Sequence, residues 1–191
     1  MKQLIAIAGG IGCGKSVVSR ILTSMGNMVY DSDSRAKQLM DNSNEIKSAI
    51  AKEICADAIT PDNRIDRRKL ASIVFSEKEK LEKLNSIVHS AVKKDILKWR
   101  ESNTAEKLWV ESAIIYESGI SEMVDEVWDV IAPEELRISR VVNRNGISPE
   151  EVKQRIDAQN ITVTNPHKRT FTLLNDGVQP LLPQILNLLK K

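Results

Sequence analysis

Short apolar runs alternate with longer amphipathic segments along this chain of 191 residues. The longer segments carry apolar residues at every third or fourth position, which is the pattern of helices with one buried face. Such alternation is typical of βαβ units and predicts an α/β fold with helices on both faces of a mostly parallel sheet. The sheet is expected to have five strands, at residues 4–8, 27–31, 107–111, 126–132 and 169–174.

A long helical stretch interrupts this alternation. From residue 34 to about 103 the pattern is almost purely helical, with helices expected at 43–56, 67–75 and 78–100 and a turn at 60–63. One crossover between two strands needs far less helix, so this stretch is predicted to be an inserted helical subdomain. The core of the single domain is then expected to comprise residues 1–33, 104–132 and 161–191.

Two further helices are expected between residues 133 and 160, separated at 145–149. Ser148 is placed to cap the second of them and Pro149 to open it, because proline suits the first helical position. The chain closes with a helix whose apolar stripe is expected to pack on the core. The stripe consists of Leu181, Leu182, Ile185, Leu186, Leu188 and Leu189.

A phosphate-binding motif follows the first strand. Residues 9–16 read Gly-Gly-Ile-Gly-Cys-Gly-Lys-Ser, a complete G-x-x-x-x-G-K-[ST] loop between a predicted strand and a predicted helix. Glycines let backbone N–H groups turn toward phosphate oxygens, and the helix N-terminus adds its positive dipole end. Lys15 is expected to reach the β- and γ-phosphates, and the Ser16 hydroxyl to ligate Mg²⁺. The motif therefore predicts a nucleoside triphosphate site, whereas an ordinary glycine-rich turn is not favoured.

Acidic residues end two predicted strands at the edge where parallel sheets bind their ligands. Asp31 and Asp33 are expected to end the second strand, placed to accept a proton from a substrate hydroxyl or to organise Mg²⁺. Capping of the next helix is the alternative, and the residues alone leave open which of the two is the base. Glu111 ends the third strand and is expected to hold Mg²⁺ through water, or to be a simple hydrogen-bond acceptor.

Three arginines recur at helical spacing after the fourth strand. Arg137, Arg140 and Arg144 lie three and four residues apart, so they share one face of a helix. Planar guanidinium groups suit phosphate, and such a stripe is able to close on a polyphosphate and stabilise developing charge. An exposed helix with three surface arginines is an equally weighted alternative.

Composition and charge disfavour several other classes of protein. The net charge is +2 with no long block of one sign, which gives no support for a nucleic-acid or membrane partner. No apolar run approaches the roughly 20 residues that a membrane-spanning helix needs. The two cysteines lie far apart and do not indicate a disulfide framework, so a cytoplasmic protein is expected.

Taken in order, the motifs resemble those of the dephospho-coenzyme A kinases, a family of P-loop small-molecule kinases. The resemblance runs from about Leu4 to Gly177, and the order and spacing of its later motifs distinguish it from other P-loop kinases. Beyond the loop, it rests on Asp31-Ser32-Asp33, Ile65-Asp66-Arg67, Leu84-Asn85-x-x-Val88-His89, Glu111, Glu117-Ser118-Gly119, Pro133-Glu134-Glu135, Arg140, Arg144, Ala158-Gln159 and Asn175-Asp176-Gly177.

The resemblance implies a three-layer P-loop kinase fold and a specific reaction. That reaction is the ATP- and Mg²⁺-dependent phosphorylation of the ribose 3′-hydroxyl of dephospho-coenzyme A, the last step of coenzyme A biosynthesis. Small-molecule substrates are then the expected partners, in a monomer or weak homo-oligomer. The helical insertion, about 34–103, would bind the acceptor, and residues of about 134–160 would form a lid.

The resemblance also implies roles for individual residues. Asp33 resembles the family's catalytic base, with Lys15 and Arg140 stabilising the transferred phosphoryl group. The acceptor would contact Asp31, Asp33, Asn85 and His89. ATP would contact Gly10, Ile11, Gly12, Cys13, Gly14, Lys15, Ser16, Val17 and Arg144.

Three positions depart from the usual pattern of the family. Ala8 stands where a hydroxyl residue is usual, Ala113 where proline is common, and Arg137 where glutamine is common. None of them belongs to the expected catalytic set, so these departures are expected to change substrate packing and not to remove activity.

Two rival functions are weighed against this one. A nucleoside monophosphate kinase would share the loop, the lid and the sheet, and the Ile65-Asp66-Arg67 and Leu84-to-His89 segments count against it. A nucleotide-dependent switch is the rival from another class. A GTPase would need Asn-Lys-x-Asp and Asp-x-x-Gly motifs, and neither occurs. A catalytically silent ATP sensor would leave the acidic pair and the arginine stripe unexplained.

Overall fold

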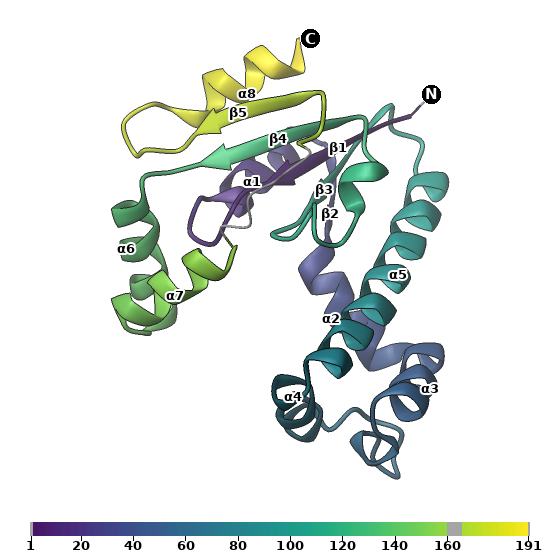
Figure 1. The fold of residues 1–191 in the computed structure, drawn as a ribbon. Helices are drawn as coiled ribbons and strands as arrows, with labels where there is room; N and C mark the ends of the chain where they lie inside the picture. The colour runs from purple at the N-terminus through teal and green to yellow at the C-terminus, as the bar shows by residue number, and fades with distance from the viewer. Residues whose placement is uncertain (1, 160–165, 191) are drawn as a thin grey trace. The chain divides into compact units, whose positions relative to one another are not determined.

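The computed structural model describes residues 2–159 and 166–190, and the chain divides into two compact units (Figure 1). The first unit comprises Met1–Asp31 and Thr104–Lys191, and the second Ser32–Asn103. Residues 160–165 lie outside the described residues. They include the end of the lid that the family resemblance implies and the start of the last expected core segment.

The first unit contains a five-stranded sheet in which every pairing is parallel. The strand order is β2-β3-β1-β4-β5. The predicted α/β class and five-stranded sheet are confirmed, and each predicted strand boundary lies within one residue of the observed one. The strands are β1 (Gln3–Ala8), β2 (Met28–Asp31), β3 (Lys107–Glu111), β4 (Glu126–Ile131) and β5 (Thr170–Leu174).

Both faces of the sheet are buried, as expected for parallel strands. Along β1, Ile5 and Ile7 point to the face that packs against α1 (Lys15–Ser24) and α8 (Leu181–Leu189), while Leu4 and Ala6 on the opposite face are equally inaccessible. This burial on both sides is characteristic of a three-layer α/β arrangement. Its apolar core holds the carboxyl ends of the strands, and thus the loops that follow them, in fixed positions.

Two tryptophans form the centre of the core on the α1 side. Trp109 of β3 and Trp128 of β4 flank β1, and their ring centroids lie 4.4 Å apart with an interplanar angle of 67°. This edge-to-face geometry is favourable for aromatic pairs. The indole nitrogen of Trp128 donates to Glu126 Oε1 (2.6 Å), so the buried polar group has a partner.

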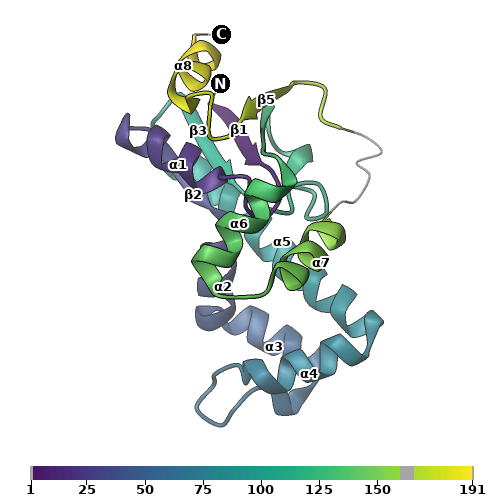
Figure 2. The ribbon, with the colours of Figure 1, turned by 90° about the vertical axis from the view of Figure 1, so that its left-hand side faces the viewer.

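Helices α6 (Glu134–Asn145) and α7 (Pro149–Gln159) follow β4 and pack side by side (Figure 2). The predicted cap is confirmed: Ser148 Oγ accepts from Glu151 N (3.2 Å), and Glu151 Oε2 accepts from Ser148 N (3.0 Å). This reciprocal pair is a capping box, and Pro149 occupies the first helical position.

The predicted stripe on the closing helix is partly wrong. Leu181 and Ile185 are buried in the core, but Leu182 and Leu186 are 48% and 38% exposed. The helix packs against the sheet and α1 on one face only. Leu182 and Leu186 each come one residue after a buried residue, so they are rotated away from this face and toward solvent.

The second unit consists of helices. Ser43 caps α3 by accepting from Ile46 N (3.3 Å), and Asp66 caps α4 by accepting from Lys69 N (2.9 Å). The turn predicted at 60–63 is present, with Asn63 at φ 59°. In the described part of the chain, no helix is long and apolar enough to cross a membrane. The helices are α2 (Ser32–Asn42), α3 (Asn44–Glu53), the short 3₁₀ helix η1 (Ala56–Ala58), α4 (Arg67–Ser76) and α5 (Lys78–Ser102).

Candidate active site

The phosphate loop joins β1 to α1 at the carboxyl edge of the sheet. Gly9 has φ +135° and Gly14 φ +98°, in the region that glycine enters without strain. Both sites are also crowded: a Cβ on Gly9 would collide with the carbonyl oxygen of Val130, and one on Gly14 with the side-chain amide of Asn175. Backbone geometry and packing therefore both require glycine at these positions.

The loop presents backbone donors at the start of α1. Its N-cap residue is Gly14, and no capping hydrogen bond from a side chain is found there among the described residues. Within the described residues, the N–H groups of Gly12 and Gly14 also have no acceptor. An uncapped helix N-terminus preceded by turned N–H groups is a binding site for phosphate.

Lys15 bends back over the loop. Its Nζ donates to the carbonyl oxygens of Gly9 (2.7 Å) and Gly10 (3.3 Å). The ammonium group is thus held on the loop itself, where it is able to neutralise the charge of a bound phosphate chain.

Arg140 of α6 reaches the same loop. Its Nη1 donates to the carbonyl oxygen of Gly12 (3.3 Å), and its Nη2 donates to the backbone oxygen (3.1 Å) and side-chain oxygen (3.2 Å) of Asn175. Asn175 in turn donates its side-chain amide to the carbonyl oxygen of Cys13 (2.8 Å). Asn175 belongs to a motif of the family resemblance, but it is absent from the predicted site list, because only the folded chain shows it between the loop and Arg140.

Two more side chains from α6 and α7 contact the loop at Ile11. Arg137 Nε donates to the carbonyl oxygen of Ile11 (3.0 Å), and Gln159 Oε1 accepts from its N–H (2.7 Å). Neither residue is in the predicted ATP-binding set. The signal for Arg137 was its place in the arginine stripe, whereas no periodicity in the sequence marks Gln159.

The third arginine of the stripe differs from the other two. Arg144 is exposed and donates to Asn145 Oδ1 (2.8 Å). In the described part of the chain no hydrogen bond joins it to the loop, so the structure brings Arg137 and Arg140 onto the loop and leaves Arg144 outside.

Two predicted ATP contacts have side chains turned into the core. Cys13 is 3% exposed and lies in the cluster between the sheet and α1, and Val17 packs against that cluster. The Cys13 side chain is therefore closed to a ligand, whereas that of Val17 is only partly buried.

Acidic groups lie at the carboxyl ends of β2 and β3. Asp31 and Glu111 are register partners on these neighbouring strands, and Glu111 also pairs with Ile7 of β1. The strand ends at Asp31, so the expectation that Asp33 also ends it needs correction: Asp33 lies in the first turn of α2. A carboxylate there is stabilised by the positive end of the helix dipole.

The donors at this edge fit Mg²⁺ better than a softer metal. Ser16, Asp31 and Glu111 offer oxygen atoms, which Mg²⁺ prefers, and Mg²⁺ usually takes one or two protein ligands together with water and substrate phosphates. Among the described residues there is no group of three or more His, Cys, Asp or Glu side chains suited to a metal. A hydroxyl and a carboxylate completed by phosphate oxygens are therefore the donor set that fits this ion here.

Asp129 of β4 was missed by the sequence reasoning. It pairs in register with Ala8, the residue before the loop, and it is half-buried. Burial raises the pKa of its carboxyl, and the nearby positive charge of Lys15 partly offsets this rise. A charged residue within the otherwise apolar Val-Trp-Asp-Val-Ile run was the available signal.

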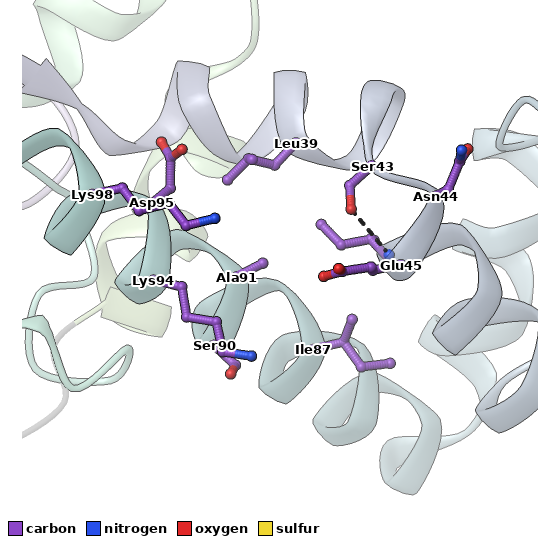
Figure 3. A pocket seen from close by; sticks show the side chains of 11 residues that line it. Leu39, Ser43, Asn44, Glu45, Ile87, Ser90, Ala91, Lys94, Asp95 and Lys98 are labelled. Carbon is purple, nitrogen blue, oxygen red and sulfur yellow. Dashed lines mark hydrogen bonds between the residues drawn. The ribbon is translucent and has the colours of Figure 1, made fainter.

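The helical unit contains a cavity of about 570 Å³ between α2, α3 and α5 (Figure 3). Leu39, Ile87 and Ala91 form apolar walls, and Lys94 and Lys98 lie toward one end. Asp95 is engaged by Arg35, whose Nε and Nη2 donate to its two oxygens at 2.8–3.0 Å. The predicted acceptor contacts Asn85 and His89 also lie on α5, but neither lines this cavity.

A parallel α/β sheet, a glycine-rich loop before an uncapped helix, and cationic side chains on that loop define a P-loop kinase. The fold itself is similar to that of shikimate kinase from Acinetobacter baumannii, with a TM-score of 0.52 at 15% identity over the whole chain and 94% of that protein. The family model for dephospho-CoA kinase matches residues 3–180. The chain belongs to the dephospho-CoA kinase family.

Individual relatives agree with this assignment. A dephospho-CoA kinase from Porphyromonas gingivalis is 41% identical over 188 residues, covering 97% of this chain and 92% of that protein. A solved dephospho-CoA kinase from Campylobacter jejuni has a TM-score of 0.66 at 25% identity over 100% of this chain and 96% of that one. The structure of TT1252 from Thermus thermophilus has a TM-score of 0.79 at 32% identity, covering 99% of this chain and 95% of that one.

Proposed function

We propose that this protein transfers the γ-phosphoryl group of ATP to the ribose 3′-hydroxyl of dephospho-coenzyme A, giving coenzyme A and ADP. The family and its relatives support the reaction and its place as the final step of coenzyme A biosynthesis. The observation that best supports this site is the position of Arg140, which is hydrogen-bonded to Gly12 of the phosphate loop and to Asn175. A guanidinium group in that place is able to stabilise the charge of the transferred phosphoryl group.

Lys15 and Arg140 act on the phosphates in this proposal. The N–H groups of Gly12 and Gly14 and the start of α1 bind the phosphate chain. Because phosphoryl transfer passes through a loose transition state, positioning and charge stabilisation contribute more than the strength of the base. The two cations are therefore expected to dominate the rate.

Asp33 is the proposed base, and Asp31 its neighbour on the acceptor side. A carboxylate accepts the proton of the attacking hydroxyl as the new O–P bond forms and the bond to the ADP oxygen breaks. Ser16, with Glu111 through water, would hold Mg²⁺, which when bound neutralises charge on the β- and γ-phosphates. Asn85 and His89 are proposed contacts of the acceptor.

We assign the acceptor to the helical unit and the lid function to α6 and α7. Arg144, on the outer part of α6, is proposed to reach ATP when the lid closes. We also infer a cytoplasmic monomer or weak homo-oligomer, since both cysteines are free thiols and the substrates are small molecules.

The test is turnover of purified protein with ATP, Mg²⁺ and a panel of acceptors. Dephospho-coenzyme A should be converted to coenzyme A, identified by co-elution with the authentic compound, and its 3′-deoxy analogue should not react. Lys15→Met serves as the inactive control. Turnover of a nucleoside monophosphate without turnover of dephospho-coenzyme A would refute the assignment and favour the rival kinase.

A further inference from the structure

Both backbone polar groups of Ile11, the third residue of the phosphate loop, are hydrogen-bonded by side chains of α6 and α7. Its carbonyl oxygen accepts from Arg137 Nε at 3.0 Å, and its N–H donates to Gln159 Oε1 at 2.7 Å. One side chain from each helix therefore engages one polar group of the same residue. We call this arrangement, formed by Arg137 and Gln159 around Ile11, the Ile11 clasp.

The side chain of Ile11 is held by the same pair of helices. It packs against an apolar cluster whose centre, Val141, Val152 and Ile156, is fully buried. This cluster is also the contact between α6 and α7. The side chain of Ile11 is thus part of the apolar contact between α6 and α7, and this packing attaches the phosphate loop to the two helices.

The two side chains of the Ile11 clasp also lie close to the neighbouring residue, Gly10. A Cβ on Gly10 would lie 2.5 Å from Arg137 Nη2 and 3.4 Å from Gln159 Oε1. Gly10 does not have a positive φ. A side chain here would therefore displace the end of Arg137, whereas the backbone conformation of Gly10 does not itself call for glycine.

The clasp also divides the donors of the loop into two groups. An N–H makes one good hydrogen bond, and that of Ile11 is already used by Gln159. By contrast, the N–H groups of Gly12 and Gly14 have no acceptor among the described residues. The N–H of Cys13 is also used, since it donates to the carbonyl oxygen of Gly10 (3.3 Å). In this conformation the loop donors left for phosphate are therefore those of Gly12 and Gly14, and not that of Ile11.

We propose that Gln159 and Arg137 are positioning residues for nucleotide binding, acting through Ile11. By fixing the two peptide groups that flank the Cα of Ile11, they hold the free protein in the turn that presents the N–H groups of Gly12 and Gly14 to phosphate. Without the clasp, a smaller fraction of the free protein has a binding-competent loop, and the apparent affinity falls by that fraction. The inference rests on the proposed function in one respect: it takes a nucleotide to be the ligand of the phosphate loop.

The first test replaces the acceptor of the clasp. Gln159→Met keeps the length of the side chain but cannot accept from Ile11 N–H, and Gln154→Met, on the exposed face of α7, is the matched control. Calorimetry with ADP should show binding about three- to tenfold weaker for Gln159→Met, the effect of one lost hydrogen bond. The control should bind as the wild type does.

The second test separates the donor of the clasp from the rest of the arginine. Glutamine at position 137 carries its Nε2 on the same carbon as the Nε of arginine, so Arg137→Gln keeps an N–H for Ile11, whereas Arg137→Met does not. Arg137→Met should weaken ADP binding severalfold, and Arg137→Gln should restore most of the loss. In coupled assays KM for ATP should follow the ADP affinity, with kcat within about twofold of wild type for Gln159→Met.

Several results would overturn the proposal. Unchanged ADP affinity in Gln159→Met, even with a lowered melting temperature, would make the contact merely structural. Tighter binding would show that Gln159 competes with phosphate, and a fall in kcat alone would place it in the chemical step. Because calorimetry needs no acceptor, wild-type protein that binds ADP but fails to phosphorylate dephospho-coenzyme A would refute the proposed function while leaving this test intact.

Discussion

The side-chain oxygen of Asn175 accepts a hydrogen bond from Nη2 of Arg140 (3.2 Å), while its amide nitrogen donates to the carbonyl oxygen of Cys13 (2.8 Å). One amide on the loop after β5 thus connects the phosphate loop to the arginine proposed to stabilise transfer. Both ends of the amide are engaged, so its orientation is determined by its two partners.

Asn175→Ala is expected to lower kcat/KM by about five- to tenfold, the effect of losing one or two hydrogen bonds. The backbone oxygen of residue 175 still accepts from Arg140, so the loss is incomplete. Steady-state kinetics with ATP varied measures it, with Asn187→Ala on the exposed face of α8 as control. Wild-type kinetics in Asn175→Ala would show that Arg140 is oriented without this amide.

Arg140→Ala is expected to lower kcat by about 10²- to 10³-fold, as when a charge-stabilising donor is removed, with a much smaller change in ATP affinity. Arg140→Lys keeps the charge but loses the fork that contacts Gly12 and Asn175 together, so it should recover only part of the rate. Arg155→Ala, on the exposed face of α7, is the control. A rise in KM for ATP with normal kcat would instead identify Arg140 as a ground-state contact.

Asp33→Asn is expected to lower kcat by about 10²-fold or more, while ADP affinity measured by calorimetry stays close to wild type. Asp31→Asn, made in parallel, tests which carboxylate is the base, because only loss of the base should remove the group that accepts the proton of the substrate hydroxyl. If Asp31→Asn has the larger effect on kcat, the assignment of Asp33 is wrong.

Most of the first unit could be predicted from the sequence because its signals are local. The phosphate motif lies between an apolar run and an amphipathic segment, and the Ser148-Pro149 start of α7 follows from capping chemistry alone. The partial error on α8 has a tertiary cause: Leu182 and Leu186 fit an apolar stripe, but the width of the buried face depends on what the helix packs against.

The parts of the site that escaped prediction depend on long-range contacts. Asn175 is 162 residues from Cys13 and Gln159 is 148 residues from Ile11 along the chain. No periodicity joins such positions, and only the parallel strand order brings the loops after β1 and β5 to the same edge. For the same reason, the spacing of Arg137, Arg140 and Arg144 predicts a shared helix face but not that Arg144 lies beyond the loop.

Asp129 gives a prediction about pH. Burial raises the pKa of its carboxyl in the folded protein, with Lys15 opposing the rise, so the folded state binds this proton more tightly than the unfolded chain does. Asp129 therefore makes the free energy of unfolding fall as pH rises from the unfolded value of about 3.9 through the raised folded value. An asparagine side chain does not titrate, so Asp129→Asn should remove this contribution.

Urea unfolding of wild type and Asp129→Asn from pH 4 to pH 8 measures the difference. The stability of the variant relative to wild type should increase with pH and then level off above the folded pKa. Asp125→Asn is unsuitable as a control because Asp125 bonds Leu4 N, so the exposed Asp157→Asn on α7 is used. Parallel stability profiles for wild type and Asp129→Asn would show that the carboxylate is ionised as easily in the fold as in the unfolded chain.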